Sequence, residues 1–298
     1  MDQISRSGGR TALITGAAGG IGQAICAGFI QRGITCLMVD VDQAGLQDAA
    51  NRLGAAAIPY CLNLTDFAAV ERLVTGLEAR FGFVDILVNN AAITRTGHFE
   101  SRSVDDILGE LNINLLAPIV LTRLMIKLLQ KSPDGRIINT VSLGGIMPLP
   151  ETSIYSAAKF GLRGMMLCLG LDAARLGVTV SSVLPSATET PMLMREAIEG
   201  GNSLQFMDPP QQPAAVARRV MALLDKPVLE GYPRWGESML VRAALLFPNL
   251  LPKLIPLFRK KGESGHRKYL ESLERRGLIA RLPDGWRLRE PDKHRADH

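Results

Sequence analysis

Short apolar runs that alternate with amphipathic segments constrain the fold of this chain more than any other feature of its sequence. The apolar runs lie at residues 11–15, 35–39, 58–62, 86–88, 136–141 and 179–184, and β-branched side chains are common in them. The segments between them, at 23–32, 43–53, 67–81, 103–130 and 153–176, have the apolar spacing of helices. Short buried strands that alternate with helices predict an α/β fold, with a doubly wound parallel sheet of about seven strands and helices on both faces.

The same alternation predicts the domain organisation. Residues 1–9 are expected to be a flexible N-terminus, and residues 10–235 to form one α/β domain. Residues 236–298 exceed what such a domain needs and are expected to form an apolar and basic C-terminal extension with helical content. With 298 residues, of which 47% are hydrophobic and 21% charged, the chain has the composition of a folded globular protein.

The charge distribution argues against nucleic acid as a partner. Residues 251–298 contain 13 Lys and Arg against 7 Asp and Glu, so the net charge of +5 belongs to the extension. The domain itself has no basic stripe with interleaved aromatic residues, and nucleic acid is therefore not expected to bind. Residues 1–10 have no apolar signal core, which predicts a cytoplasmic protein.

The cysteines and histidines do not indicate a metal or disulfide site. The four cysteines are scattered without a C-x-x-C pair, and their apolar surroundings predict buried thiols. The four histidines also lack ligand spacing, so no metal is expected. The cysteines are Cys26, Cys36, Cys61 and Cys168.

A glycine-rich turn, TGAAGGIG at residues 15–22, joins the first predicted strand to the first predicted helix. Glycines allow a tight reversal and a close approach of the backbone to a pyrophosphate, and the helix that follows directs free N–H groups towards it. An acidic residue, Asp40, ends the second strand. This combination predicts a dinucleotide rather than a plain turn.

Asp40 also predicts which dinucleotide binds. Its carboxylate can accept hydrogen bonds from both ribose hydroxyls and would repel a 2′-phosphate. No Lys or Arg occurs within residues 16–22 or at Val41 to offset that repulsion. NAD is therefore favoured over NADP.

Tyr155 and Lys159 lie four residues apart in the segment SIYSAAKF, so on a helix both side chains emerge from one face. Alone, the pair would be read as a half-buried aromatic residue beside a lysine that reaches solvent. A nearby ammonium and a positively charged nicotinamide ring would instead favour the phenolate of a tyrosine whose ordinary pKa is about 10. The pair is thus a candidate for general acid and base catalysis.

Several motifs occur together in the order found in the short-chain dehydrogenase/reductase superfamily, which the chain resembles over about residues 10–230. The motifs are TGxxxGxG at 15–22, NNAG at 89–92 with Ala92 for glycine, a serine thirteen residues before Tyr155, and YxxxK at Tyr155 and Lys159. The resemblance implies a Rossmann-type fold and a homodimer or homotetramer. It also implies a catalytic set made up of Asn114, Ser142, Tyr155 and Lys159.

The resemblance implies a role for each member of that set. Tyr155 would exchange a proton with the substrate oxygen, and Lys159 would tune it and hold the nicotinamide ribose. Ser142 would hydrogen-bond the substrate oxygen, a contribution of about 2–4 kcal/mol for a well-placed donor. Asn114 would position a water that links Lys159 to solvent. The residues expected to contact the cofactor are Gly16, Gly20, Ile21, Gly22, Asp40, Asn63, Leu64, Asn90, Tyr155, Lys159, Pro185, Thr188 and Thr190.

Two positions depart from the superfamily pattern. Asn63 stands where an aspartate usually contacts the adenine amino group, and its amide oxygen is expected to accept in its place. Ser186 replaces the glycine of a Pro-Gly pair, which puts the backbone of that loop in question.

Apolar residues predict the walls of a substrate pocket. The loop at 192–213 and the facing segment 147–150 are rich in methionine, leucine and proline, which suits a bulky lipophilic alcohol or ketone. Ordinary packing of a mobile lid explains the pattern equally well. The apolar loop residues are Met192, Leu193, Met194, Leu204, Phe206 and Met207.

The extension contains an apolar stretch, 239–258, that is interrupted by Arg242, Lys253 and three prolines, which argues against a membrane span. Basic residues 259–261 follow at once, so a peripheral membrane contact through 239–261 is one interpretation. An arm packed on the domain, on a partner subunit or over the substrate mouth is the other, and it is favoured. Residues 269–276 are expected to form a charged helix before a frayed end.

The sequence therefore predicts an NAD-dependent oxidoreductase that interconverts a secondary alcohol and a ketone, acting on a steroid-like or long-chain substrate. The alternatives are an NADPH-dependent β-ketoacyl or polyketide ketoreductase, and a dinucleotide-binding regulator without turnover.

Overall fold

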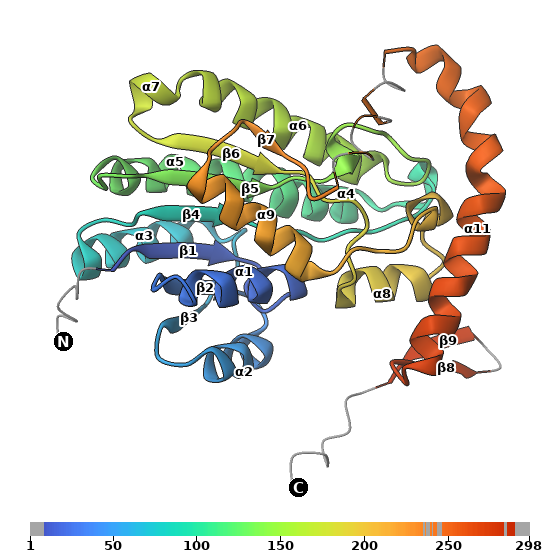
Figure 1. Cartoon of the computed structure of the whole chain (residues 1–298), viewed down its shortest axis with the longest axis horizontal. Coiled ribbons are helices and arrows are strands. Elements are labelled where there is room, and N and C mark those ends of the chain that lie inside the picture. The colour runs from blue at the N-terminus through green and yellow to red at the C-terminus, as the bar shows by residue number, and fades with distance from the viewer. Residues whose placement is uncertain are drawn as a thin grey trace, which may run out of the picture.

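One parallel sheet forms the centre of the molecule (Figure 1), with strand order β3-β2-β1-β4-β5-β6-β7. The computed structural model describes residues 9–234, 236, 239, 241–242, 246–282 and 285–289. Every neighbouring pair in this sheet is parallel, which confirms the predicted doubly wound fold. The strands are β1 (Thr11–Thr15), β2 (Thr35–Asp40), β3 (Ala57–Cys61), β4 (Ile86–Asn89), β5 (Arg136–Thr140), β6 (Thr179–Val183) and β7 (Glu230–Gly231).

Helices cover both faces of the sheet because its strands are apolar on both sides. In β1, Ala12 and Ile14 belong to one core cluster and Leu13 to the other. The first face is covered by α1 (Gly20–Ile30), α2 (Gln43–Leu53) and α9 (Pro213–Asp225). The opposite face is covered by α3 (Phe67–Phe81), α5 (Ala117–Gln130) and α6 (Ser153–Leu171).

The helix predicted over residues 103–130 is interrupted in the structure. It consists of α4 (Val104–Leu111), a π-helical turn at Asn112–Leu116, and α5. A π-turn inserts an extra residue into the helical ladder and often marks a functional position. Similarly, the segment predicted over 153–176 is α6 followed by the short α7 (Ala173–Leu176).

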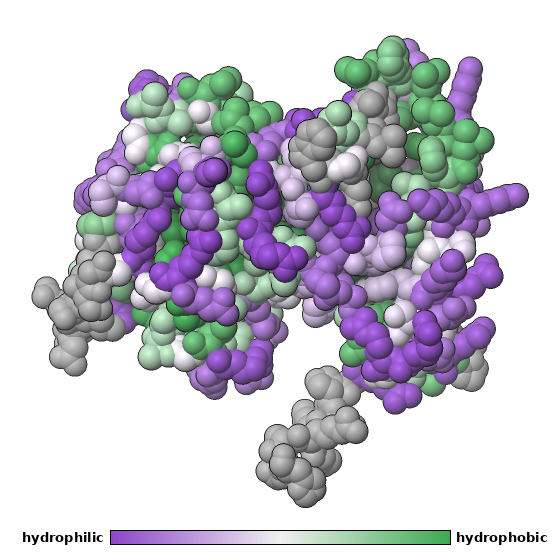
Figure 2. Space-filling view, in the orientation of Figure 1, coloured by the Kyte–Doolittle hydropathy of each residue, from purple (hydrophilic) through white to green (hydrophobic). Residues whose placement is uncertain are grey.

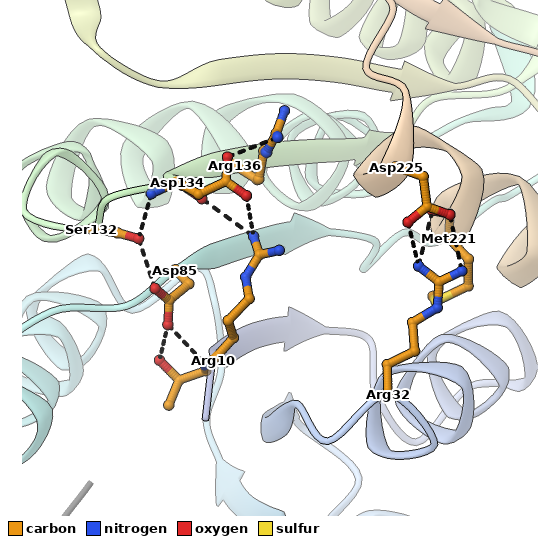
Figure 3. A network of polar contacts seen from close by, with 9 residues as sticks. Arg10, Arg32, Asp85, Ser132, Asp134, Arg136, Met221 and Asp225 are labelled. Carbon is orange, nitrogen blue, oxygen red and sulfur yellow. Dashed lines mark hydrogen bonds and ion pairs between the residues drawn. The ribbon is translucent and has the colours of Figure 1, made fainter. Parts of the chain in front are cut away.

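A polar network ties together the amino ends of three strands (Figure 3). The buried carboxylate of Asp85, just before β4, accepts hydrogen bonds from the Thr11 amide at 2.7 Å, the Thr11 hydroxyl at 3.3 Å and the Ser132 hydroxyl at 2.6 Å. Beside it, Arg10 and Arg136 both form ion pairs with Asp134. These contacts hold the amino ends of the strands, which lie opposite to the carboxyl ends where a ligand is expected.

The extension folds into a long helix, α11 (Leu251–Arg275), and an antiparallel hairpin of β8 (Ile279–Leu282) and β9 (Gly285–Leu288). Figure 1 shows α11 along one side of the molecule, beyond the carboxyl ends of the sheet strands. The predicted helical extension is confirmed, and the charged helix expected at 269–276 is the last part of α11, which begins earlier, at Leu251. The expected frayed end was wrong for residues 279–282 and 285–288, which form the hairpin. Residues 1–8 and 290–298 lie outside the described part of the chain, so the predicted flexible N-terminus does as well.

Two further expectations can be compared with burial. Cys26 and Cys36 are buried as predicted, whereas Cys61 and Cys168 are exposed, because they lie at a strand end and on an outer helix face. The helical stretch Val104–Gln130 has the length and apolar composition of a membrane span. Its α5 part, however, packs on the sheet through Leu121, Met125 and Leu129.

Candidate active site

The glycine turn lies between β1 and α1, at the carboxyl edge of the sheet. Gly16 has a φ of +65°, and a side chain there would lie 2.8 Å from the Ala91 Cα. A side chain on Gly22 would collide with the backbone carbonyl of Gly16. The N-cap residue Gly19 makes no side-chain cap hydrogen bond to α1. This close-packed turn followed by an uncapped helix start fits a dinucleotide pyrophosphate.

Asn90 and Asp40 hold the two sides of this turn. The Asn90 side chain donates to the carbonyls of Thr15 at 3.0 Å and Gly16 at 3.3 Å. The Asp40 carboxylate accepts from the amides of Ala18 at 2.9 Å and Val41 at 2.8 Å. Asp40 is thus at the end of β2 beside the turn, where a ribose of the dinucleotide would lie.

Tyr155, Lys159 and Ser142 meet at one end of a cavity beside β5 and α6. The Lys159 Nζ lies 5.7 Å from the centroid of the Tyr155 ring and donates to the Thr140 carbonyl at 3.1 Å. The Ser142 hydroxyl accepts from the Gly144 amide at 2.9 Å and is hydrogen-bonded to the Tyr155 phenol. The structure therefore brings together three of the four predicted catalytic residues.

Burial dominates the electrostatics of this group. It raises the pKa of Tyr155 above its ordinary value, and the hydrogen bond from Ser142 only partly opposes it. Burial also lowers the pKa of Lys159 to about 8, because the side chain is only 2% exposed. The protein groups alone therefore do not produce the expected fall in the pKa of Tyr155.

Asn114, the fourth predicted residue, is fully buried in the π-turn. Its amide group donates to the Ile93 carbonyl at 2.7 Å and accepts from the Ile93 amide at 2.9 Å. Both polar atoms thus hold the loop that follows β4. In the structure Asn114 connects this loop to the helix, whereas its expected role towards a water beside Lys159 stays a prediction.

A cavity of about 290 Å³ extends from Tyr155 between the predicted walls. It is lined by apolar residues of both segments, which are Met147, Leu149, Met192, Leu193, Leu204 and Met207. Phe206 instead packs in a separate cluster under α11, and Met194 packs against that cluster. Of the predicted cofactor residues, the same cavity gathers Ile21, Asn90, Tyr155, Lys159, Pro185, Thr188 and Thr190.

The remaining predicted cofactor residues show one disagreement. The Asn63 oxygen, expected to accept from adenine, already accepts from both the amide and the hydroxyl of Thr65, at 3.0 and 2.9 Å. It forms a local turn, so this expectation is not supported. Leu64 is 8% exposed and packs in the core, which leaves only its backbone for a ligand.

The replacement of glycine by Ser186 is tolerated. Among the described residues, Glu151 is the non-glycine with a positive φ, so the loop at Ser186 does not need glycine. Gln211 donates to both the carbonyl and the hydroxyl of Ser186, at 3.2 and 3.3 Å. Next to it, Thr190 begins α8 (Pro191–Ile198), where its hydroxyl accepts from the Leu193 amide at 3.3 Å.

The sequence analysis missed a carboxyl group inside the cavity. Glu196 on α8 lines it, accepts from the Gln205 amide at 2.9 Å, and is hydrogen-bonded to Thr94. Burial raises the pKa of Glu196, which these hydrogen bonds partly oppose, and its charge also raises the pKa of Tyr155. Its spacing from Met192 and Leu193, one helical turn, is the only signal in the sequence that could have indicated it.

The comparisons with known proteins agree with this geometry. The family model for short chain dehydrogenase matches residues 10–199 of the chain. The chain belongs to this family. An oxidoreductase of this kind interconverts a CH–OH group and a ketone, with a nicotinamide dinucleotide as the hydride carrier.

Curated relatives of this short-chain dehydrogenase include 3-oxoacyl-[acyl-carrier-protein] reductases. The protein from Salmonella typhimurium is 36% identical over 184 residues, which are 62% of this chain and 75% of the relative. The one from Thermotoga maritima is 34% identical over 187 residues, covering 62% and 76%. The family model ends at residue 199 and so leaves the C-terminal extension uncovered.

Solved structures share the fold. A 3-ketoacyl-(acyl-carrier-protein) reductase from Brucella melitensis, complexed with NADH, is 27% identical with a TM-score of 0.69, covering 75% of this chain and 95% of its own. Levodione reductase is 25% identical with a TM-score of 0.69, covering 77% and 98%.

Proposed function

We propose that this short-chain dehydrogenase reduces the ketone of a 3-oxoacyl thioester to the corresponding alcohol, with NADH as the hydride donor. The observation that carries the proposal is the apolar cavity that ends at Tyr155 and Ser142, since an acyl chain can lie along it with its ketone at these hydroxyls. The naming of the relatives as 3-oxoacyl reductases favours this substrate over the steroid-like alcohols that the sequence analysis placed first.

Tyr155, Ser142 and Lys159 would each have a different role in this reduction. The bound dinucleotide would supply a hydride to the carbonyl carbon. Tyr155 would give its phenolic proton to the carbonyl oxygen, and Ser142 would donate a hydrogen bond to that oxygen as negative charge develops on it. Lys159 would place positive charge beside the phenolate that remains, and would restore it to the phenol by proton transfer.

Three features support binding of the dinucleotide by this chain. The close-packed turn at Gly16 and Gly22 leaves room only for backbone, which suits a pyrophosphate. Asp40 offers a carboxylate to a ribose and favours NADH over NADPH. The same cavity would then hold the nicotinamide between Ile21 and Thr190.

The experiment is a substrate panel with the purified full chain. Acetoacetyl-coenzyme A, longer 3-oxoacyl-coenzyme A esters and steroid ketones are offered with NADH or NADPH, and nucleotide absorbance is followed. We expect turnover of the thioesters with NADH, and loss of turnover in Tyr155→Phe with NADH binding retained. Turnover of the steroid ketones alone would restore the lipophilic-alcohol interpretation, and turnover of no ketone would contradict the proposal.

Two expectations about the setting also stay proposals. The enzyme is expected to be a cytoplasmic homodimer or homotetramer. A regulator without turnover is disfavoured, because Tyr155, Ser142 and Lys159 are gathered at one cavity end.

A further inference from the structure

The two halves of α11 contact the rest of the molecule in different ways. In the C-terminal half, Tyr269, Leu270 and Leu273 are buried with Leu193 and Phe206 of the substrate loop. Glycines make this close contact possible, because a side chain on Gly262 would lie 2.7 Å from the Ser203 carbonyl and one on Gly265 would collide with the Phe206 carbonyl. This half confirms the favoured interpretation, in which the extension packs on the domain.

The first part of α11, residues 251–261, buries Leu251 and leaves its other side chains exposed or partly exposed, as are the residues just before it. Leu246, Phe247 and Leu257 expose 73%, 63% and 72% of their surface. Figure 2 shows a hydrophobic area at this end of α11, whereas the other end is hydrophilic. We use the name apolar-basic face for a set of exposed side chains, namely Leu246, Phe247, Leu250, Lys253, Leu254, Leu257, Phe258 and Lys260.

The helical part of this face is one-sided. At about 100° per residue, Leu254, Leu257 and Phe258 fall within an arc of about 100°, and Lys253 and Lys260 lie beyond one edge of it. Lys261, which pairs with Asp208, falls inside this arc one turn further along and ends the apolar stripe. An apolar stripe bordered by lysines is the arrangement of a helix that lies in the plane of a membrane surface. Exposed contiguous apolar side chains on this scale indicate an interaction site.

Charge decides between the occupants. Residues 246–262 contain four Lys and Arg and no Asp or Glu. Arg259 pairs with Glu263 and Lys261 with Asp208, so Lys253 and Lys260 supply the charge of the face. In a two-fold dimer the face would pack on itself, and the lysines of both copies would meet without an acidic partner. A surface with anionic groups outside and an apolar interior beneath them complements both the lysines and the apolar side chains of this face.

We propose that the apolar-basic face docks on the surface of an anionic lipid bilayer. The face lies beside the mouth of the active-site cavity, because Asp208 lines that cavity and forms an ion pair of 3.0 Å with Lys261, three residues after Phe258. Docking would hold the mouth close to the lipid, where lipophilic substrates concentrate. The docking itself does not depend on which ketone the enzyme reduces.

The test uses the full chain and flotation with two kinds of vesicle, phosphatidylcholine alone and phosphatidylcholine mixed with phosphatidylglycerol. We expect binding to the mixed vesicles that weakens as salt is raised. The variant Phe247→Ser/Leu257→Ser should weaken this binding by about tenfold or more, because two exposed apolar anchors are lost. The variant Lys253→Glu/Lys260→Glu should remove the preference for phosphatidylglycerol.

Matched controls keep the result interpretable. Leu171→Ser changes a leucine of similar exposure (78%) at the end of α6, and should bind like the wild type. All variants should retain the wild-type thermal unfolding midpoint and NADH binding, since none of these residues lines the cavity.

Absence of wild-type binding to the mixed vesicles would overturn the proposal, as would equal binding by Phe247→Ser/Leu257→Ser. If these substitutions instead lower the mass measured by light scattering, the face joins two copies of the chain and the lipid interpretation is wrong.

Discussion

The preference for NADH over NADPH rests on the charge of Asp40, and the size of this preference can be worked out from the repulsion between two charges. A unit charge about 4 Å from another contributes about 1 kcal/mol at the dielectric of water and about 4 kcal/mol at an effective dielectric of 20. Asp40 is partly exposed, so a value between these limits applies to a 2′-phosphate placed at the ribose site. The wild type should therefore bind NADH between about 5 and about 800 times more tightly than NADPH.

The perturbation is Asp40→Asn, measured as dissociation constants for both nucleotides by fluorescence titration. The carboxylate accepts from the amides of Ala18 and Val41, and the substituted amide cannot accept from both in the same way. NADH binding should weaken, and the ratio between the nucleotides should fall to near one. Asp42→Asn is the control, because Asp42 carries the same charge two residues away but caps α2 by accepting from the Gly45 amide at 3.0 Å.

One cation near the turn could reverse this outcome. Arg52 donates to the Gln23 side chain at 3.0 Å, and Gln23 donates to the Ala18 carbonyl at 2.6 Å. Its position was not evident from the sequence, because Arg52 lies thirty residues beyond Gly22. If the wild type prefers NADPH and Arg52→Ala loses that preference, the reasoning from Asp40 is refuted.

Three further perturbations test the electrostatics and the fold. Burial lowers the pKa of Lys159 to about 8, below the ordinary value of about 10.5, so wild-type stability should rise with pH from about 8 to 10.5. Lys159→Met should lack this slope and, at about pH 7, be about 3 kcal/mol more stable in urea unfolding, although inactive. Asp85→Ala should lower the free energy of unfolding by about 3 kcal/mol, because it removes an acceptor of three buried hydrogen bonds, and an unchanged urea midpoint would contradict the network of Figure 3. Glu196→Gln should move the pH profile of alcohol oxidation to lower pH, because loss of the Glu196 charge lowers the pKa of Tyr155. Steady-state kinetics across pH measure this profile, and an unmoved profile would exclude the coupling.

The sequence predicted the sheet well because its strands are buried on both faces and read as continuous apolar runs. It predicted the glycine turn, Ser142, Tyr155 and Lys159 because these depend on short spacings within a strand–turn–helix or a single helix. A helical extension was predicted, but the full length of α11 was not, since Pro252 and Pro256 are strong breaking signals. Pro252 lies in the first turn, where its missing N–H costs nothing, and Pro256 interrupts only one bond further along.

The missed residue Glu196 depends on tertiary contacts, whereas the expected role of Asn63 competes with a local hydrogen bond. Glu196 enters the cavity because α8 packs against α11 and the β8–β9 hairpin, and no local pattern records that placement. Asn63 was expected to face adenine, but its oxygen is used by Thr65 two residues away. Local hydrogen bonds of this kind compete with ligand contacts, and a motif comparison does not show which one prevails.

The burial that shapes the site also sets the proton state of Tyr155 and Lys159 before a cofactor binds. Burial holds the pKa of Tyr155 above its ordinary value, so near neutral pH the phenol keeps its proton and is ready to donate it. A ketone reductase needs this state at the start of the reaction, whereas an alcohol dehydrogenase needs the phenolate. Lys159, with its pKa lowered to about 8, can in turn give up a proton to restore the phenol after each turnover. This proton state of the pair is compatible with the proposed reduction of a 3-oxoacyl substrate.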